Sequence, residues 1–326
     1  MCRAFLSPYY KRGGFNPADD KDEPVFIGRF NIGAISLNLP MILAKSREEG
    51  KDFYEVLDYY LEMIRGIHLR TKEYLGNMRA SCNPLGFCEG GFYGGHLNLN
   101  DKIAPVLKYC TASFGITALN ELNELYNGKS IYEDGEFPLE VMKYINQKKS
   151  DYTEEDGLLY AIYGTPAENL CGLQVKQFRK KYGIIKNVSD RDYVSNSFHC
   201  HVAEDITPID KQNSEIRFWD LFNGGKIQYA RYPINYNKLA VKSMLDRSMA
   251  EGLYEGVNFA LSFCEDCGYA SVEMDINDDC PRCHGKHIFR IDRMNGYLAV
   301  SRGNRGDGDS RLSEHKLKEI HDRMSM

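Results

Sequence analysis

Cys264-Glu265-Asp266-Cys267 and Cys280-Pro281-Arg282-Cys283 decide the fold of the C-terminal part of this chain, and twelve residues separate them. Four thiolates suit a tetrahedral Zn²⁺ ion, and two tight turns joined by a short hairpin can deliver them with little strain. Gly268 and Gly285, which lie close to the two pairs, suit such turns. The spacing therefore predicts a structural zinc ribbon.

The metal ligands expected in this ribbon are four thiolates, from Cys264, Cys267, Cys280 and Cys283. Two redox-active pairs, or unrelated buried thiols, are the alternative interpretation of the same spacing. His284 and His287 lie close enough in the sequence to replace a cysteine as a ligand.

The composition is that of an ordinary globular protein. The chain has 326 residues, of which 43% are hydrophobic and 27% charged, and its formal net charge is −5. This charge provides no broad basic surface, which counts against a dedicated nucleic-acid binder. No apolar run approaches the length of about 18 residues that a membrane span needs, and the N-terminus does not have the pattern of a signal peptide. Ten cysteines, four of them at metal spacing, fit a reducing cytosol, so we expect a cytoplasmic protein.

A short motif, Arg293-Met294-Asn295-Gly296-Tyr297, begins ten residues after the last of these four cysteines. Read alone, Gly296 supplies a positive φ angle in a turn. Behind four cysteines, however, the segment resembles the C-terminal region of anaerobic (class III) ribonucleotide reductases, where a zinc site precedes an Arg-x-x-Gly-Tyr loop. The resemblance implies that Gly296 carries a stable backbone radical. Glycine suits this role because its Cα can flatten and delocalise the unpaired electron over the flanking amide groups.

The N-terminal stretch resembles the core of the same reductases. Cys2-Arg3-Ala4-Phe5-Leu6 precedes a polar loop and then the segment Arg29–Pro40, which contains Asn31. Read without this context, Cys2 is an incidental thiol. In the family, the matching cysteine lies at the tip of a finger loop and forms a transient thiyl radical that abstracts the 3′-hydrogen of the substrate. The resemblance implies that Cys2 is the thiyl residue and that Asn31 is a polar active-site residue near the ribose.

The stretch Tyr163–Leu170 predicts a helix that starts directly after a strand. Thr165 occupies the N-cap position, Pro166 follows at the first helical position and Glu168 stands at the third. Free backbone N–H groups at such a helix start can bind an anion, although a cap without a ligand is the alternative. The stretch also resembles a family segment that faces the substrate, which implies binding of the nucleotide phosphates by the amides of Thr165 and Ala167.

Asn196-Ser197-Phe198-His199 is a further candidate stretch. From the residues alone, His199 fits a core histidine, a metal ligand or an active-site hydrogen-bonding group. The stretch resembles the family's Thr-Asn-Ser-Phe-His, which lines the barrel and implies that Asn196, Ser197 and His199 contact the substrate. The other thiols in the first part of the chain read as ordinary buried cysteines rather than catalysts, namely Cys82, Cys88 and Cys110.

Strands and helices are predicted to alternate between residues 25 and 260, which indicates an α/β fold with a largely parallel sheet. We expect a long amphipathic helix from Arg47 to about Leu75, opened by the capping box Ser46-x-x-Glu49, and a further helix over Phe114–Tyr126. The resemblance implies the C-terminal half of a ten-stranded α/β barrel of the glycyl radical enzyme and ribonucleotide reductase type. The expected domains are a partial catalytic barrel with a finger loop at 1–30, a zinc ribbon, and a glycyl radical loop with a terminal helix, over 1–260, 261–290 and 291–326.

The activity that the resemblance implies is anaerobic reduction of ribonucleoside triphosphates to 2′-deoxyribonucleoside triphosphates, the precursors for DNA replication. A separate radical-SAM activase with a 4Fe-4S cluster generates the radical on Gly296, which then oxidises Cys2. Formate or a redoxin serves as the final reductant. Because the resemblance covers only the C-terminal half of a family member, we expect a split gene, an interrupted reading frame or a truncation. We also expect dependence on a complementary N-terminal polypeptide, and a homodimer when the enzyme is complete.

Two other interpretations stay open at this point. A relative of pyruvate formate-lyase shares the glycyl radical loop and the barrel, but such enzymes typically lack the four-cysteine ribbon and carry a Cys-Cys pair at the finger, whereas Arg3 follows Cys2. A non-catalytic zinc-ribbon remnant or interaction module is compatible with the ribbon alone. The joint presence of Cys2, Asn31 and Gly296 argues against that interpretation.

Overall fold

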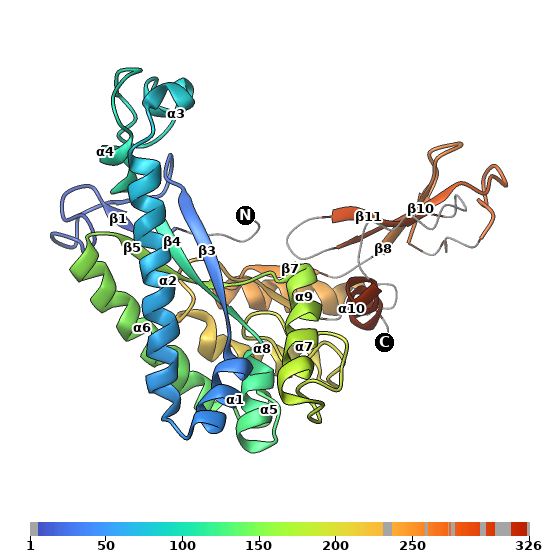
Figure 1. Cartoon of the computed structure of the whole chain (residues 1–326). Helices are drawn as coiled ribbons and strands as arrows, with labels where there is room; N and C mark the ends of the chain where they lie inside the picture. Colours follow the sequence, from blue (N-terminus) through green and yellow to red (C-terminus); the bar gives the residue numbers. More distant parts are fainter. Residues whose placement is uncertain are drawn as a thin grey trace.

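The computed structural model describes residues 6–230, 237–257, 260–272, 274, 278–293, 298–303 and 314–324. In this part of the chain a parallel sheet covered by helices is joined to a separate antiparallel sheet that contains the four cysteines. Figure 1 shows the antiparallel sheet projecting away from the helical body. Among the described residues, no helix combines the length and the apolar composition needed to traverse a lipid bilayer.

The central sheet has three parallel strands in the order β3-β4-β5. These strands are β3 (Asn31–Asn38), β4 (Thr111–Thr117) and β5 (Leu159–Gly164). Parallel neighbours need crossover connections, and helices supply them here. The crossover helices are α1 (Leu39–Glu49), α2 (Phe53–Gly76), α5 (Leu119–Asn127) and α6 (Glu136–Asp156). The expected mixed α/β fold with a parallel sheet is therefore present.

The main core lies between one face of this sheet and the helices α2 and α6. Phe114 and Ile116 on β4 alternate with small and polar residues, as a strand with two different faces requires. Leu57 and Leu61 of α2 pack against this apolar face and are almost fully buried. The opposite face carries Ser113 and Gly115, so it has no bulky apolar side chains at these positions.

Shorter elements complete the body of the molecule. Before β4 these are β1 (Tyr9–Tyr10), β2 (Pro24–Val25), the 3₁₀ helix Ala80–Cys82, α3 (Pro84–Phe87) and α4 (Ala104–Leu107). After β5 these are α7 (Glu168–Tyr182), α8 (Pro208–Trp219), β6 (Gln228–Ala230), α9 (Lys238–Ala250), β7 (Glu255–Val257) and α10 (Glu314–Met324). Strands β6 and β7 pair in parallel, and α10 packs against α7.

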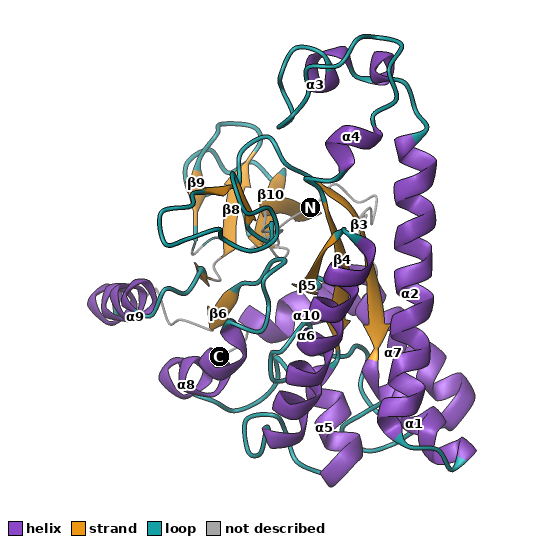
Figure 2. Ribbon diagram, turned by 90° about the vertical axis from the view of Figure 1, so that its left-hand side faces the viewer, coloured by secondary structure: helices purple, strands orange, loops and turns teal. Residues whose placement is uncertain are grey.

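The cysteine-containing sheet is antiparallel, with the order β11-β10-β8-β9. Its strands are β8 (Ala260–Cys264), β9 (Ala270–Ser271), β10 (Ile288–Arg293) and β11 (Leu298–Gly303). Figure 2 shows β8, β9 and β10 of this sheet grouped on the other side of the molecule from α2. Because β10 and β11 belong to this sheet, the strands on either side of residues 294–297 continue directly from the ribbon.

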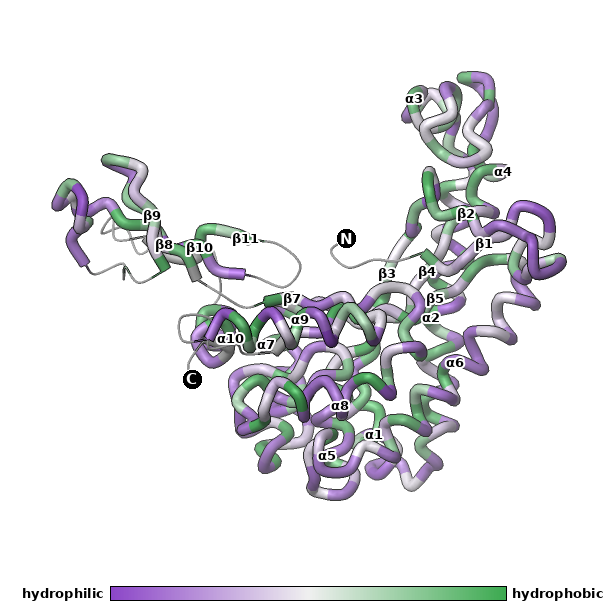
Figure 3. Tube along the Cα trace, turned by 180° about the vertical axis from the view of Figure 1, so that it is seen from behind, coloured by the Kyte–Doolittle hydropathy of each residue, from purple (hydrophilic) through white to green (hydrophobic). Residues whose placement is uncertain are grey.

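The loop between β1 and β2 is strongly hydrophilic, as its purple colour in Figure 3 shows. Its backbone is nevertheless ordered around one buried carboxylate, because the amides of Arg12, Gly13 and Ala18 all donate to Asp22 at 2.7–3.0 Å. Burial alone would raise the pKa of Asp22, but these three hydrogen bonds hold it below its usual value.

The two edges of the parallel sheet differ. At the β5 edge, Asn223–Gly225 supplies hydrogen-bonding partners: the amide of Gly224 donates to Ile162 at 2.8 Å, and Gly225 accepts from Gly164 at 2.8 Å. At the β3 edge, the described part of the chain provides no neighbouring strand. An open strand edge is a site at which another strand can pair.

Two of the predicted helices are wrong in their boundaries. The single helix over 47–75 is broken, since Gly50 ends α1 in the left-handed conformation at φ 63° and Asp52 caps α2 through the Tyr54 amide at 2.8 Å. Ser46 lies inside α1 and donates to Leu43, so it forms no capping box. The segment predicted as a helix over Phe114–Tyr126 starts as strand β4, because β3 and β5 pair with it on both sides.

The predicted helix start at Thr165 is also wrong by two residues. Helix α7 begins at Glu168, and Ala167 occupies the N-cap position without a side-chain cap. Thr165 instead extends the sheet, because its amide donates to Ile116 of β4 at 3.1 Å.

Candidate functional site

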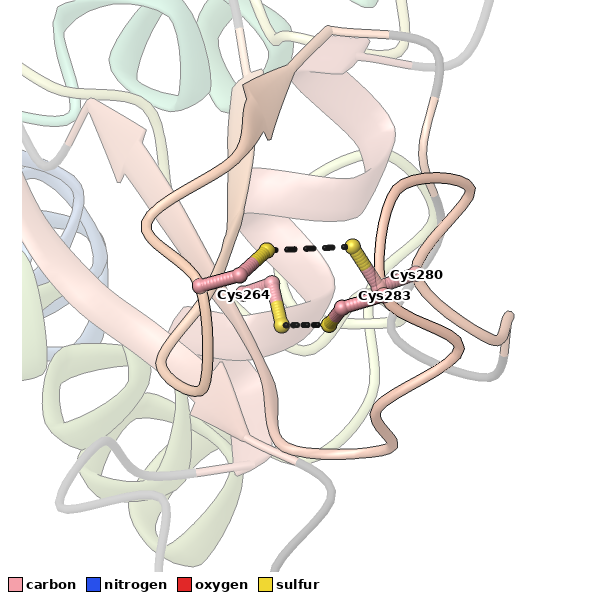
Figure 4. Close-up of side chains that lie close together, drawn as sticks. Cys264, Cys280 and Cys283 are labelled. Atoms are coloured by element: carbon pink, nitrogen blue, oxygen red, sulfur yellow. Dashed lines mark hydrogen bonds between the residues drawn. The ribbon is translucent and has the colours of Figure 1, made fainter.

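The four cysteines of the ribbon form one compact cluster. Their sulfur atoms all lie within 4.8 Å of one another. Two sulfur–sulfur contacts of 3.6 Å join Cys264 to Cys283 and Cys267 to Cys280, and Figure 4 draws both. Each contact links one Cys-x-x-Cys pair to the other, as a single shared metal ion requires.

Zinc fits this donor set. Four sulfurs at 2.3 Å from a central Zn²⁺ define a tetrahedron with edges of about 3.8 Å, close to the observed separations. No histidine belongs to the cluster among the described residues. His287 instead bonds Asp266 at 2.8 Å, so the cysteines alone supply the ligand atoms. The four-cysteine cluster predicted from the sequence is therefore present.

The two turns that carry the cysteines have matching backbone geometry. Gly268, directly after the first pair, has φ 72°, and its amide donates to Cys264 at 2.9 Å. His284 occupies the matching place after the second pair, has φ 58° and donates to Cys280 at 2.8 Å. The left-handed residue of the second turn is thus His284, and Gly285 follows it. Gly285 is required for a different reason, because an added Cβ would overlap the carboxylate of Asp266.

A second group of candidate residues gathers where β3, β4 and β5 end. The hydroxyls of Ser36 on β3 and Thr165 after β5 lie 2.9 Å apart. They meet directly above Gly115 of β4, where an added Cβ would overlap both oxygens. Gly115 therefore permits a contact between the two outer strands across the middle one.

The next part of this group comes from the loop that follows α7. Asn196 is buried and accepts a hydrogen bond from the Ala167 amide at 2.6 Å through Oδ1. The amides of Thr165 and Ala167 were expected to bind the substrate phosphates. Both already have acceptors within the protein, Ile116 for Thr165 and Asn196 for Ala167.

Glu121 at the start of α5 holds this loop in place. Its carboxylate accepts from the amide of Ser195 at 3.0 Å and from the Ser195 hydroxyl at 2.6 Å, and Arg191 lies 3.5 Å away. Burial raises the pKa of Glu121, against the opposing effects of Arg191 and Ser195.

Ser197 is the most constrained member of the group. It has φ 52°, an uncommon conformation for a residue other than glycine, and its side chain is 1% exposed. Its Oγ has no hydrogen-bond partner among the described residues. The hydroxyl lies so close to Gly164 that a Cβ there would overlap it. We call Ser36, Thr165, Ala167, Asn196 and Ser197 the strand-end site.

His199 belongs to a separate buried ionic network. Its Nδ1 lies 2.9 Å from Glu215, which also accepts from Lys211 at 2.5 Å. Burial alone would raise the pKa of Glu215, but Lys211 and His199 keep it below its usual value. Burial alone would lower the pKa of Lys211, but Glu215 keeps it above its usual value. The ring of Tyr229 covers the network at 4.5 Å from the His199 ring.

The remaining predicted residues are dispersed. Asn31 donates to the Ser113 hydroxyl and accepts from the Gly33 amide at 2.8 Å. It precedes Ser36 by five residues on β3, or about 16 Å at the rise of a strand, so it does not contact the strand-end site. Gly296 and Cys2 lie outside the described residues. Of the three cysteines expected to be buried, Cys110 is buried, Cys88 is half-buried and Cys82 is exposed.

Sequence reasoning missed Lys211, Glu215 and Glu121. The Lys-x-x-x-Glu spacing of the first two marks an ion pair on one helix face, but such pairs usually face solvent. Glu121 lies in the repetitive segment Leu119–Leu125, which also reads as an exposed helix surface. Only burial distinguishes these three residues, and burial depends on tertiary packing.

Comparison with known proteins identifies the family. The model of the family described as anaerobic ribonucleoside-triphosphate reductase matches residues 1–325. The chain is 30% identical over 310 residues to the reductases of Haemophilus influenzae and Escherichia coli, covering 91% of this chain and 42% of each relative. It is 29% identical over 328 residues to the enzyme of Enterobacteria phage T4, covering 97% of this chain and 51% of that protein. The chain thus spans about half the length of these relatives, or less.

Solved structures share the fold. A solved anaerobic ribonucleotide reductase superposes with a TM-score of 0.65 at 19% identity, covering 90% of this chain and 45% of the other. The Thermotoga maritima enzyme in complex with dATP and CTP superposes with a TM-score of 0.64 at 19% identity, covering 84% of this chain and 45% of that one. Together with the match along the sequence, these results establish that the chain belongs to the anaerobic ribonucleoside-triphosphate reductase family.

Proposed function

We propose that this chain acts as the C-terminal part of an anaerobic ribonucleoside-triphosphate reductase, which converts ribonucleoside triphosphates into 2′-deoxyribonucleoside triphosphates. The observation that carries the proposal is the four-thiol cluster directly ahead of Arg293–Tyr297, in a chain whose family match runs over residues 1–325. In this proposal residues 1–260 form half of a ten-stranded barrel. Residues 261–290 form the zinc ribbon, and residues 291–326 carry the glycyl radical loop.

The proposed chemistry uses two residues that exchange one hydrogen atom. A radical-SAM activase with a 4Fe-4S cluster removes a hydrogen atom from the Cα of Gly296. The resulting radical takes the hydrogen atom of the Cys2 thiol, and the thiyl radical then takes the 3′-hydrogen of the ribose. The protonated 2′-hydroxyl leaves as water, formate or a redoxin supplies the two electrons that reduce the sugar, and Cys2 returns the hydrogen atom to C3′. Asn31 is assigned a polar contact near the ribose, and zinc holds the ribbon together without taking part in the reaction.

The strand-end site is the proposed place for the substrate phosphates. It combines the hydroxyls of Ser36 and Thr165 with the start of the fifteen-residue helix α7, where backbone dipoles favour an anion. The buried Ser197 hydroxyl, which lacks a partner among the described residues, can donate a hydrogen bond to a ligand. The Thermotoga maritima relative has been solved in complex with dATP and CTP, which supports a nucleoside triphosphate as ligand.

The proposed macromolecular partners are the activase and a complementary N-terminal polypeptide, with a homodimer as the complete assembly. The open edge of β3 supports the second partner. A groove of about 310 Å³ lies beside β3, lined by residues of β3, α1, α2 and α7 that include the apolar Ile35, Met63 and Ile67. Met63 and Ile67 are each 44% exposed. An unpaired strand beside exposed apolar side chains is suited to pairing with another strand that carries its own apolar cover.

Reconstitution tests the proposal. The chain is combined under strict anaerobiosis with the N-terminal part of a family member, the activase, S-adenosylmethionine, a reductant for the activase, and formate or a redoxin, and deoxynucleotide formation from CTP is measured. We expect product with wild type and with the control Cys82→Ser, which removes an exposed thiol. We expect a glycyl radical signal but no product with Cys2→Ser, and neither with Gly296→Ala. Full turnover by Cys2→Ser would contradict the proposed mechanism.

A further inference from the structure

Arg293 ends β10 immediately before residues 294–297, and its side chain is directed into the body of the protein. The side chain is only 8% exposed although it belongs to the projecting sheet. Its guanidinium carbon lies 5.4 Å from the centre of the Tyr229 ring. A buried cation beside an aromatic face is an energetically significant contact that fixes two segments relative to each other.

The guanidinium occupies space that exists only because residue 256 is a glycine. An ideal Cβ on Gly256 would overlap the guanidinium carbon and Nη2 of Arg293, and would lie only 2.7 Å from Nη1. Gly256 is not among the residues with a positive φ, so its backbone conformation does not demand glycine. Glycine is needed here because a side chain would take the space that the guanidinium occupies. Gly256 and Tyr229 pair directly across the β6–β7 ladder, so these two short strands together form a receptor for one arginine.

The receptor adjoins the buried ionic network. The Tyr229 ring that contacts Arg293 also contacts the His199 ring at 4.5 Å, and the Lys211 ammonium lies 5.0 Å from its centre. The contacts therefore run without interruption from the strand that precedes residues 294–297 to His199. Lysine is not expected to replace arginine in this arrangement, because its single ammonium does not reproduce the planar, three-nitrogen guanidinium that lies against Gly256.

We propose that Arg293 is a positioning residue: its guanidinium, seated between Gly256 and Tyr229, fixes β10 and β11, the strands on either side of the proposed radical residue Gly296 in the sequence, against the body of the protein. This inference rests on the proposed role of Gly296. The receptor itself consists of groups outside that chemistry, so the docking can be tested without generating a radical.

The first experiment is hydrogen–deuterium exchange on the full chain with zinc bound. Gly256→Ala fills the gap and leaves Arg293 intact. We expect exchange in β10 and β11 to rise roughly tenfold, as loss of one buried cation–ring contact predicts, with unchanged zinc content. The matched control is Gly66→Ala, because an added Cβ on Gly66 meets nothing within 4 Å. Wild-type exchange in Gly256→Ala would overturn the proposal.

A double-substitution cycle separates the contact from a general effect on β7. If Arg293 is what the new methyl group displaces, Gly256→Ala has no further effect on hairpin exchange once Arg293→Ala is present. Additive effects of the two substitutions would overturn the proposal. Arg293→Lys is expected to behave like Arg293→Ala.

The radical yield then connects docking to function. In the reconstituted complex, Gly256→Ala is expected to lower the glycyl radical signal per chain about tenfold, in parallel with the loss of the cation–ring contact. A normal yield in Gly256→Ala would contradict the positioning role. If wild type itself forms no radical while Gly256→Ala still loosens the hairpin, the proposed function fails and the docking of Arg293 stands.

Discussion

The parallel sheet and the cysteine ribbon are held together by different forces. The sheet packs a continuous apolar cluster that joins β3, β4 and β5 to α1, α2, α6 and α8. Among its described residues, the ribbon has a cluster of four buried side chains, and two of these, Cys264 and Cys280, are the predicted metal ligands beside Met274 and Ile288. A region with so little apolar burial needs a metal ion or another crosslink to fold. The two regions can therefore be perturbed one at a time.

Removing the metal should produce the largest difference in exchange protection between the ribbon and the parallel sheet. We expect a strong chelator to abolish exchange protection in β8, β9, β10 and β11, because binding of structural zinc is coupled to folding of its site. The sheet should keep its protection, since its core does not involve the metal. Cys280→Ser should have the same effect, and Cys82→Ser should have none. A ribbon that stays protected after complete loss of zinc would show that the metal is not what holds it.

Phe114→Ala should have the opposite effect to metal removal, because it should destabilise the parallel sheet and leave the ribbon intact. Phe114 is 1% exposed and lies 5.5 Å from the Tyr160 ring and 5.8 Å from the His68 ring. Its truncation should lower the free energy of unfolding of the sheet region by about 3–5 kcal/mol. The chain has a single tryptophan, Trp219, which belongs to the same core, so urea unfolding followed by its fluorescence measures the change.

The control for this substitution is Phe26→Ala, which removes a side chain that is 51% exposed and should change stability little. Zinc content should stay the same in both variants. Loss of zinc from Phe114→Ala would mean that the stability of the ribbon depends on the sheet core. It would contradict the view that the two regions are stabilised independently.

Mild acid should weaken the body of the protein through His201. Burial lowers the pKa of His201 to about 3, whereas in the unfolded chain it is about 6.5. As the pH falls from 6.5 towards 5, the unfolded state therefore takes up a proton that the folded state does not. Each pH unit then removes up to about 1.4 kcal/mol from the free energy of unfolding.

His201→Gln should flatten this dependence. The test is urea unfolding at several pH values between 7 and 5, monitored through Trp219 and compared with wild type. Equal slopes for wild type and variant would contradict the assignment to His201.

The smallest effect is expected from His284→Gly in the ribbon. His284 has φ 58°, which costs a residue with a side chain roughly 1 kcal/mol and costs glycine little. The variant should hold zinc more tightly in competition with a chelator, and the stability of the sheet should not change. Gly268→Ala introduces the same strain in the first turn and should weaken zinc retention, so the two substitutions are expected to shift retention in opposite directions.

The sequence predicted best what depends on residues close together along the chain. The four ligands come from two short motifs, so their spacing alone predicts the cluster. At the strand-end site, by contrast, Ser36 lies far along the chain from Thr165 and Ser197, and no local pattern relates these residues to one another or to Gly115 beneath them. The strand β4 was predicted as helix because the helical pattern of Leu119–Asn127 follows it directly. The need for glycine at position 256 depends on where the distant Arg293 docks, so the sequence around Gly256 could not predict it.

Cleavage of the backbone by oxygen tests whether Gly296 carries the radical. The chain is incubated anaerobically with the complementary N-terminal polypeptide, the radical-SAM activase, S-adenosylmethionine and a reductant, then exposed to air and weighed by intact mass spectrometry. Oxygen cleaves the backbone at a glycyl radical, so we expect loss of a fragment that begins at Gly296, and an intact chain for Gly296→Ala. An intact wild-type chain, beside a complete family member that is cleaved under the same conditions, would contradict the assignment of Gly296 as the radical site.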